Sequence, residues 1–167
     1  MEKVEKVICY ESEQLLTDKD ITDFMNSSGI TLPKEFTRFY KTYNGGYPNA
    51  NWSSGLELIC PLNYFLPIKY GAKTIESILK EIAPENMIPF ADNKIDSYYC
   101  LYTGDDENYG KIYYLSTLGK YELDLHCNNF NTFINNLAID GIYGKVRTKA
   151  GKLYEDLDAY LEQRKEY

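Results

Sequence analysis

The sequence LPKEFTRFYKTYNGG, residues 32–46, predicts a single amphipathic helix. Four aromatic side chains recur at the spacing that places them on one helical face: Phe36, Phe39, Tyr40 and Tyr43. Thr31 can cap the start of this helix, and Pro33 suits its first turn, where the missing N–H is not needed. Gly45 and Gly46 can adopt the left-handed conformation that ends a helix. We therefore expect the aromatic face of this helix to pack into a core.

Further helices are predicted on both sides of this segment. Thr17 caps one, with Asp20 in the position of a capping box, and Gly29 ends it. Thr74 caps the next, and Pro84 ends it. The first of these helices is predicted to pack through Ile21, Phe24 and Met25, and the second through Ile75, Ile78, Leu79 and Ile82. Two later helices are predicted, one with its packed face at Phe130, Phe133, Ile134 and Leu137 and one with it at Leu153, Leu157, Tyr160, Leu161 and Arg164.

Three strand candidates follow one another before the helix that begins near Phe130. Residues 97–103 and 111–115 are apolar on both faces and are predicted to be central strands. Residues 121–125 alternate between apolar and polar side chains, so this strand is predicted to be half-exposed. The connections are short and polar, which predicts an antiparallel meander.

The middle of the chain carries weaker signals. Residues 47–55 are rich in Asn, Ser, Pro and Gly and are predicted to form a loop. Residues 56–60 and 62–70 are predicted as short strands, and Pro61 and Pro67 favour a sheet edge for them. Helices mixed with antiparallel strands predict an α+β fold, with an antiparallel-rich β-sheet packed against α-helices.

The composition limits the partners this chain can have. A chain of 167 residues with 44% hydrophobic residues can bury a real core. A net charge of −7 at pH 7 argues against nonspecific binding to nucleic acid or to an anionic membrane, because both need a basic surface. The charge suits a basic partner, although it also aids solubility. The charged N-terminus, residues 1–14, does not resemble a signal peptide, and no segment is long enough to span a membrane, so we expect a cytoplasmic location.

Catalytic and metal-binding patterns are weak throughout the sequence. The four cysteines, Cys9, Cys60, Cys100 and Cys127, are scattered without a CxxC pair, which favours free thiols. The one histidine, His126, stands beside Cys127, and adjacent residues on a strand point to opposite faces, which argues against a nucleophile–base pair. There is no glycine-rich phosphate loop and no metalloprotease motif. We predict no catalytic residue, no metal site, no cofactor and no enzymatic activity.

The sharpest charge cluster is GDDENYG, residues 104–110. Its three consecutive carboxylates are Asp105, Asp106 and Glu107, and Tyr109 follows them. The spacing does not fit an EF-hand, in which ligands alternate with other residues. A solvated hairpin loop between two glycines is one interpretation, and an acidic loop that faces a protein partner is the other.

Three other residues have the same two interpretations. Asp92 and Asp96 flank a predicted turn, where they either form the turn or contact a partner. Trp52 is the only tryptophan and lies in the predicted loop, where it either folds back onto the core or anchors a partner. The candidate partner-binding residues are therefore Trp52, Asp92, Asp96, Asp105, Asp106, Glu107 and Tyr109.

An ordered series of motifs resembles one known family. The amphipathic helix at residues 32–46 resembles the signature of the SUKH superfamily, which comprises bacterial toxin-immunity proteins with fungal cell-wall regulators as distant relatives. The segments that follow it in the family's order are residues 87–92, 97–103, 110–115 and 129–137. The match extends from about Ile21 to Leu137, and residues 93–96 depart from it because they lack the glycines usual in that turn.

The resemblance implies a domain organisation and a function. Residues 1–138 would form one SUKH-like domain, with residues 139–167 as a connector and C-terminal helix appended to it. The protein would be an immunity protein that binds and neutralises a cognate bacterial toxin, for example a nuclease with a basic surface. The alternative is a cytosolic interaction or regulatory module of the same fold without a toxin partner.

Overall fold

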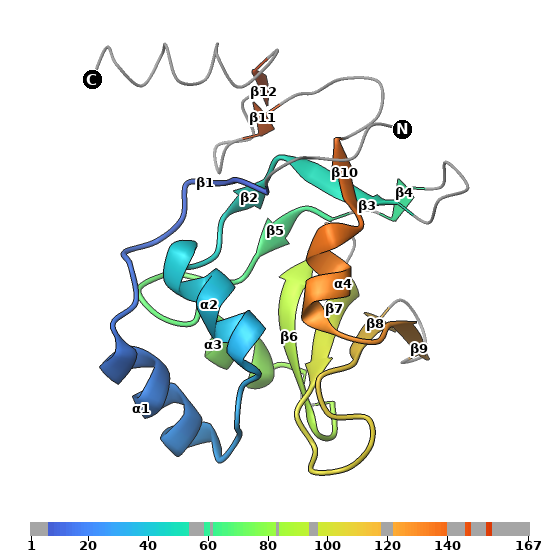
Figure 1. The fold of residues 1–167 in the computed structure, drawn as a ribbon. Coiled ribbons are helices and arrows are strands. Elements are labelled where there is room, and N and C mark those ends of the chain that lie inside the picture. The colour runs from blue at the N-terminus through green and yellow to red at the C-terminus, as the bar shows by residue number, and fades with distance from the viewer. Residues whose placement is uncertain are drawn as a thin grey trace.

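A computed structural model describes residues 7–53, 59–60, 62–82, 84–93, 97–117, 122–139, 146–147 and 153–154 (Figure 1). The principal element is an antiparallel sheet of five strands in the order β5-β6-β7-β8-β9. These strands are β5 (Tyr64–Phe65), β6 (Met87–Asp92), β7 (Ser97–Tyr102), β8 (Ile112–Ser116) and β9 (Glu122–Cys127). Strands β7 to β9 follow one another as the predicted meander, β6 precedes them in the same antiparallel order, and the structure confirms the α+β fold class.

Among the described residues, three small antiparallel sheets accompany the large sheet. They join β1 (Cys9–Tyr10) to β2 (Tyr47–Pro48), β3 (Ala50–Ser53) to both β4 (Ile59–Cys60) and β10 (Leu137–Ile139), and β11 (Val146–Arg147) to β12 (Leu153–Tyr154). The loop predicted over residues 47–55 is therefore wrong, because β2 and β3 lie within it. Leu137 begins β10 instead of lying on a helix, and Leu153 lies in β12 instead of in the predicted last helix, most of which falls outside the described residues.

The helices of the described chain are α1 (Asp18–Ser28), α2 (Lys34–Thr42), α3 (Ile75–Leu79) and α4 (Phe130–Asn135). The capping box predicted for α1 is confirmed, since the Thr17 hydroxyl accepts the Asp20 N–H and the Asp20 carboxylate accepts the Thr17 N–H. Gly29 ends α1 in the left-handed conformation, with φ of 70°. Thr74 caps α3 as predicted, and Ser77 completes its capping box.

Helix α2 lies where the aromatic pattern predicts, but its ends differ. Pro33, and not Thr31, is the residue before the first turn, and no side chain caps it. The helix ends as Tyr43 becomes extended, so the two glycines do not terminate it. Gly45 and Gly46 have positive φ, and a Cβ on Gly45 would lie 2.7 Å from the Phe65 carbonyl oxygen. The glycines therefore allow the chain to pass close to β5.

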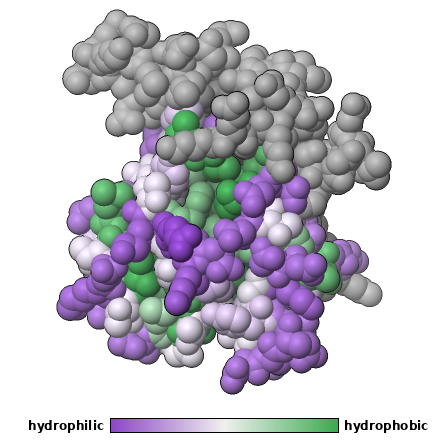
Figure 2. Space-filling model, in the orientation of Figure 1, coloured by the Kyte–Doolittle hydropathy of each residue, from purple (hydrophilic) through white to green (hydrophobic). Residues whose placement is uncertain are grey.

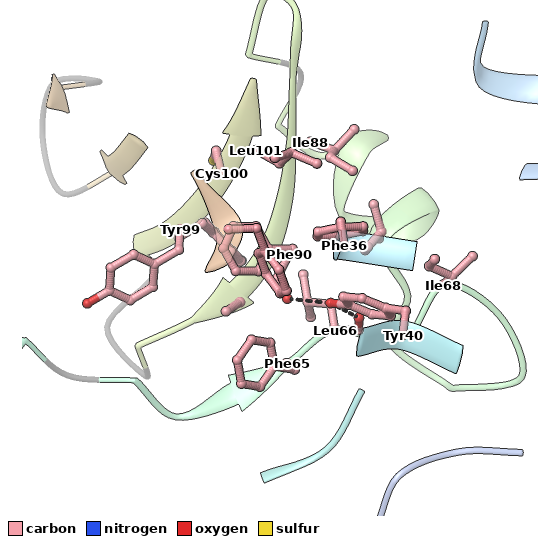
Figure 3. Packing of buried hydrophobic residues seen from close by; sticks show 14 of the residues in the cluster. Phe36, Tyr40, Phe65, Leu66, Ile68, Ile88, Phe90, Tyr99, Cys100 and Leu101 are labelled. Atoms are coloured by element: carbon pink, nitrogen blue, oxygen red, sulfur yellow. Dashed lines mark hydrogen bonds between the residues drawn. The ribbon is translucent and has the colours of Figure 1, made fainter. Parts of the chain in front are cut away.

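The core lies between α2, α4 and the large sheet, where the rings of Phe36, Phe130 and Phe90 contact one another. Figure 3 shows Phe36 and Tyr40 of α2 beside Phe90 of the sheet. Phe36 and Tyr40 are fully buried, as the pattern predicts, whereas Phe39 is only partly buried. The hydroxyl of Tyr40 donates to the carbonyl oxygens of Leu66, at 2.9 Å, and Phe90, at 3.1 Å. This satisfies the only polar atom of a buried ring and links α2 to the sheet.

The sheet has a second face, which α3 partly covers. Tyr99 contacts Phe133 of α4, so its neighbour Tyr98 points to the opposite face. There the ammonium of Lys73, just before α3, lies 5.8 Å from the centre of the Tyr98 ring, and α3 packs against β6. Strand β9 is the last strand of this sheet among the described residues, and it is more exposed than its alternation predicts.

Candidate functional site: an acidic loop at one end of the sheet

The acidic loop, defined here as residues 103–110 between β7 and β8, is an ordered turn. Its base is closed by hydrogen bonds from the Tyr102 N–H to the Lys111 carbonyl (2.9 Å) and from the Gly110 N–H to the Tyr102 carbonyl (2.9 Å). The Thr103 N–H donates to the Asn86 carbonyl at 2.8 Å, which ties the loop to the segment before β6. Figure 2 shows hydrophilic side chains gathered where this loop lies in Figure 1.

Asp106 organises the loop from within. Its Oδ2 accepts the Tyr102 hydroxyl at 2.6 Å, and its Oδ1 accepts the Asn108 N–H at 2.8 Å. The hydrogen bond from Tyr102, more than that from Asn108, holds the pKa of the Asp106 carboxyl below its usual value. Both oxygens of this carboxylate therefore stabilise the conformation of the turn.

Asp105 and Glu107 are exposed on either side of Asp106. Their carboxylates are the charges that the loop can offer to a partner. Tyr109 is also exposed, yet its hydroxyl donates to the carbonyl of Thr31 at 2.9 Å. This contact joins the loop to the connection between α1 and α2, so Tyr109 positions the loop while part of its side chain is exposed.

Asp92, another sequence-predicted candidate, lies at the opposite end of the sheet. Asp92 pairs with Tyr98, whereas the loop follows Tyr102, which pairs with Met87 at the opposite end of β6. Asp92 is buried, and its carboxylate accepts the side chains of Asn63 (3.0 Å) and Lys73 (3.2 Å). These contacts give it a role in holding β5 and the start of α3 to the sheet.

Trp52 and Asp96 are not brought to the acidic loop by any described contact. Trp52 lies in β3, where its backbone is opposite Leu137 of β10 and Cys60 of β4, and its side chain is outside the described residues. Asp96 is also outside the described residues. Both therefore remain predictions from the sequence.

Tyr102 contacts the acidic loop, although the sequence does not mark it as a candidate. It stands at the end of β7 and positions Asp106, and its ring lies 6.1 Å from that of Tyr113 on the neighbouring strand. The signal in the sequence is a tyrosine four residues before Asp106, at the base of the acidic turn. Tyr102 also belongs to residues 97–103, which are predicted to form a central strand, and side chains of a central strand are usually buried.

His126 and Cys127 are both partly buried. The His126 ring packs 4.9 Å from Tyr99 and 5.8 Å from Phe133, and burial lowers its pKa to about 4. Burial also raises the pKa of the Cys127 thiol to about 11, so it is protonated at neutral pH. Cys9 and Cys100 are free and buried, and burial raises the pKa of each.

The described residues contain neither a cluster of metal ligands nor a membrane-spanning helix. No three His, Cys, Asp or Glu side chains in this part of the chain lie close enough to hold a metal ion. No helix formed by these residues combines the length and the apolar character needed to cross a membrane.

Comparison with known proteins supports the resemblance noted in the sequence. No curated protein matches the chain significantly. The model of the SMI1 / KNR4 family (SUKH-1) matches residues 15–136, which span α1 to α4 and include the acidic loop and the whole five-stranded sheet. The match covers well over half of the 167 residues, and so this chain belongs to the SMI1 / KNR4 family (SUKH-1).

Proposed function

We propose that this protein is an immunity protein that binds a cognate bacterial toxin and neutralises it by protein–protein contact. The family match over residues 15–136 carries this proposal, because the family is known in toxin immunity and in related regulators. The family fold is generally non-catalytic, in keeping with binding as the activity. The protein would act in the cytoplasm, where it would bind a toxin delivered by another cell or a toxin that its own cell produces.

The acidic loop supports a basic partner. Asp105 and Glu107 are exposed at one end of the five-stranded sheet, and the chain carries a net charge of −7. Complementary charge speeds the encounter of two proteins and disfavours wrong partners. A toxin that cleaves nucleic acid has a basic cleft, so an acidic loop would associate rapidly with it and block access to that cleft.

A regulatory module without a toxin is the alternative, because the family also contains regulators. The two functions differ in genomic context and in phenotype. An immunity gene is expected to lie beside a large gene whose product ends in a toxin domain. A regulator has no such requirement.

The test is protection of cells by co-expression. The toxin domain encoded beside this gene is expressed from an inducible promoter in a susceptible bacterium, with and without the full-length protein. We expect growth to be restored only when the protein is present, together with a complex that co-purifies at equal stoichiometry. Continued killing by an active toxin domain in the presence of well-expressed protein would exclude immunity against that toxin.

A matched variant connects protection to folding. Phe36→Asp places a charge in the core and should abolish protection by unfolding the protein. The exposed Arg38→Asp on the same helix should remain folded and should still protect. Protection by the Phe36→Asp protein equal to that by the wild type would show that protection in this assay does not depend on the folded protein.

A further inference from the structure

A pocket of about 700 Å³ opens on the second face of the sheet, beside the acidic loop. It lies between the chain that follows α3 and strands β8 and β9. Its apolar wall is formed by Ile82, Met87, Tyr102, Leu115 and Leu123. Leu115 of β8 lies opposite Tyr98 of β7 and opposite Leu123 of β9. These three side chains therefore lie on the same face of the sheet, which α3 covers only in part.

The outer strand extends this wall with unusually exposed leucines. Leu123 is 44% exposed and Leu125 is 54% exposed. They stand two residues apart on β9 and therefore point to the same face, opposite Leu115 and Tyr113 of β8. Contiguous apolar surface of this kind marks binding sites on folded proteins more often than scattered exposed residues do.

The charges around the pocket have one sign. Glu81 and Glu85 are the only ionised side chains among the described residues that line it. Tyr102 connects the pocket to the acidic loop, because its ring lines the pocket while its hydroxyl donates to Asp106. The apolar pocket and the acidic loop are thus two parts of one continuous surface.

We propose that this pocket receives an apolar side chain of the partner protein, carried on a segment whose neighbouring residues are Lys or Arg. The apolar side chain would rest on Leu115, Leu123 and Tyr102, and the basic neighbours would meet Glu81, Glu85 and the acidic loop. An apolar centre with a charged rim is the usual arrangement of an energetic anchor in a protein interface. The inference rests on the proposed function, since it describes how the neutralised toxin is held.

The direct probe is a synthetic peptide, acetyl-Gly-Lys-Lys-Leu-Phe-Lys-Lys-Gly-amide, titrated to millimolar concentration into the isotope-labelled full chain. Amide chemical shifts should change at Tyr102, Leu115 and Leu123. Two control peptides separate the contributions, one with Gly-Gly in place of Leu-Phe and one with Glu in place of every Lys. Each control should bind about tenfold more weakly than the parent peptide, or worse.

Matched variants test the same pocket in the protein. Leu123→Asp should weaken peptide binding about tenfold or more, because it places a carboxylate in the apolar wall. Leu15→Asp is the control, since Leu15 is 63% exposed and lies before α1, outside the pocket lining. Urea unfolding of both variants should remain close to that of the wild type.

Several results would overturn the proposal. They are the absence of shifts at millimolar peptide, shifts confined to other residues, and equal binding of the Glu-containing peptide. Sedimentation that reveals self-association abolished by Leu123→Asp would instead assign the pocket to a second copy of the chain.

Co-expression separates this proposal from the proposed function. A Leu123→Asp protein that still protects cells and binds the toxin domain as tightly as the wild type removes the pocket from the interface and leaves immunity intact. A wild-type protein that binds the peptide in the pocket but never protects against an active adjacent toxin domain contradicts immunity, while the pocket's preference for a basic, apolar segment stands.

Discussion

Asn44 is fully buried, and its side chain uses three hydrogen-bonding positions. Its amide donates to the carbonyls of Gln14 (2.9 Å) and Lys69 (2.7 Å), and its Oδ1 accepts the Ile68 N–H at 3.0 Å. One side chain therefore joins the segment before α1, the end of α2 and the segment after β5. The burial of the Asn44 side chain is tolerated because its amide and its Oδ1 are hydrogen-bonded, and the same bonds satisfy the backbone groups that it contacts.

Replacing Asn44 with Ala should lower the free energy of unfolding by about 3 kcal/mol, because one N–H and two carbonyls would lose their partner inside the protein. Urea denaturation measures this change. Asn26→Ala is the control, since Asn26 is exposed on α1, and it should alter stability by less than about 0.5 kcal/mol. Equal effects of the two substitutions would refute the role assigned to Asn44.

His126 makes stability depend on pH in a defined direction. Burial lowers its pKa from 6.5 to about 4, so the folded protein binds its proton less readily than the unfolded chain does. The unfolded chain therefore gains protons first as the pH falls through this interval, and stability is lost on acidification. Well above pH 6.5 the residue is neutral in both states and has no such effect.

We expect the part of the pH dependence that is due to His126 to amount to about 1–2 kcal/mol between pH 6.5 and about pH 4, because partial exposure reduces the effect of the full shift. His126→Phe keeps a ring beside Tyr99 and Phe133 and cannot titrate. Its unfolding free energy should fall less steeply over this interval than that of the wild type. It should also protect cells fully, because His126 has no predicted role in catalysis.

The aromatic residues on one face of helix α2 are buried to different degrees. Phe36 is fully buried and contacts Tyr40, Phe90 and Phe130, with ring centres between 4.6 and 5.8 Å apart. Phe39 lies at the margin of the same face, where it contacts Phe65 at 5.1 Å and remains partly exposed.

Phe36→Ala should lower the free energy of unfolding by about 3–5 kcal/mol, since it removes a fully buried ring and leaves a cavity. Phe39→Ala should reduce it less, by about 2 kcal/mol, because part of this ring is already in water. Arg38→Ala, on the exposed side of the helix, is the control. The opposite order for the two phenylalanines in urea unfolding would mean that α2 is rotated from the orientation described here.

At the scale of the whole molecule, the five-stranded sheet separates its two ends. Asp92 and Lys73 form an ion pair at one end, at 3.2 Å, while the acidic loop projects from the other. Strand β6, whose six residues include Asp92, extends from one end to the other, and its length corresponds to roughly 20 Å of extended chain. Carboxylates that form two clusters in the sequence therefore belong to different regions of the surface.

Neutralising the exposed carboxylates, with Asp105→Asn and Glu107→Gln together, should slow association with a basic toxin several-fold at low salt. Charges at an interface rim act mainly on the encounter rate. Asp106 is left intact because it shapes the turn. The double variant should unfold at the same urea concentration as the wild type, since exposed carboxylates contribute little to stability. Stopped-flow fluorescence measures the association rate.

The control for this variant makes the same change in net charge elsewhere. Asp23→Asn with Glu76→Gln removes two exposed carboxylates on α1 and α3. It should slow association much less than the loop variant if the loop itself meets the toxin, and both differences should shrink at high ionic strength. Equal slowing by the two double variants would assign the effect to net charge and not to the acidic loop.

Local features of this protein could be predicted from the sequence because their causes lie within a few residues. The capping box of Thr17 and Asp20 needs only its own spacing, and α1 begins where it predicts. The apolar strands 97–103 and 111–115 and their short connection are likewise sufficient to predict a hairpin with an acidic turn. The family resemblance has the same origin, since it is a series of such local motifs.

Tertiary structure alone decided which of these features reach the surface. Asp92 and Asp105 are equivalent in the sequence as acidic turn residues, yet Asp92 is buried against Asn63 and Lys73 while Asp105 is exposed. Leu123 has the alternation of a half-buried strand, yet it borders an open pocket, because α3 covers only part of that face. The physical reason is that burial depends on what packs against a side chain from distant parts of the chain, which no local pattern records.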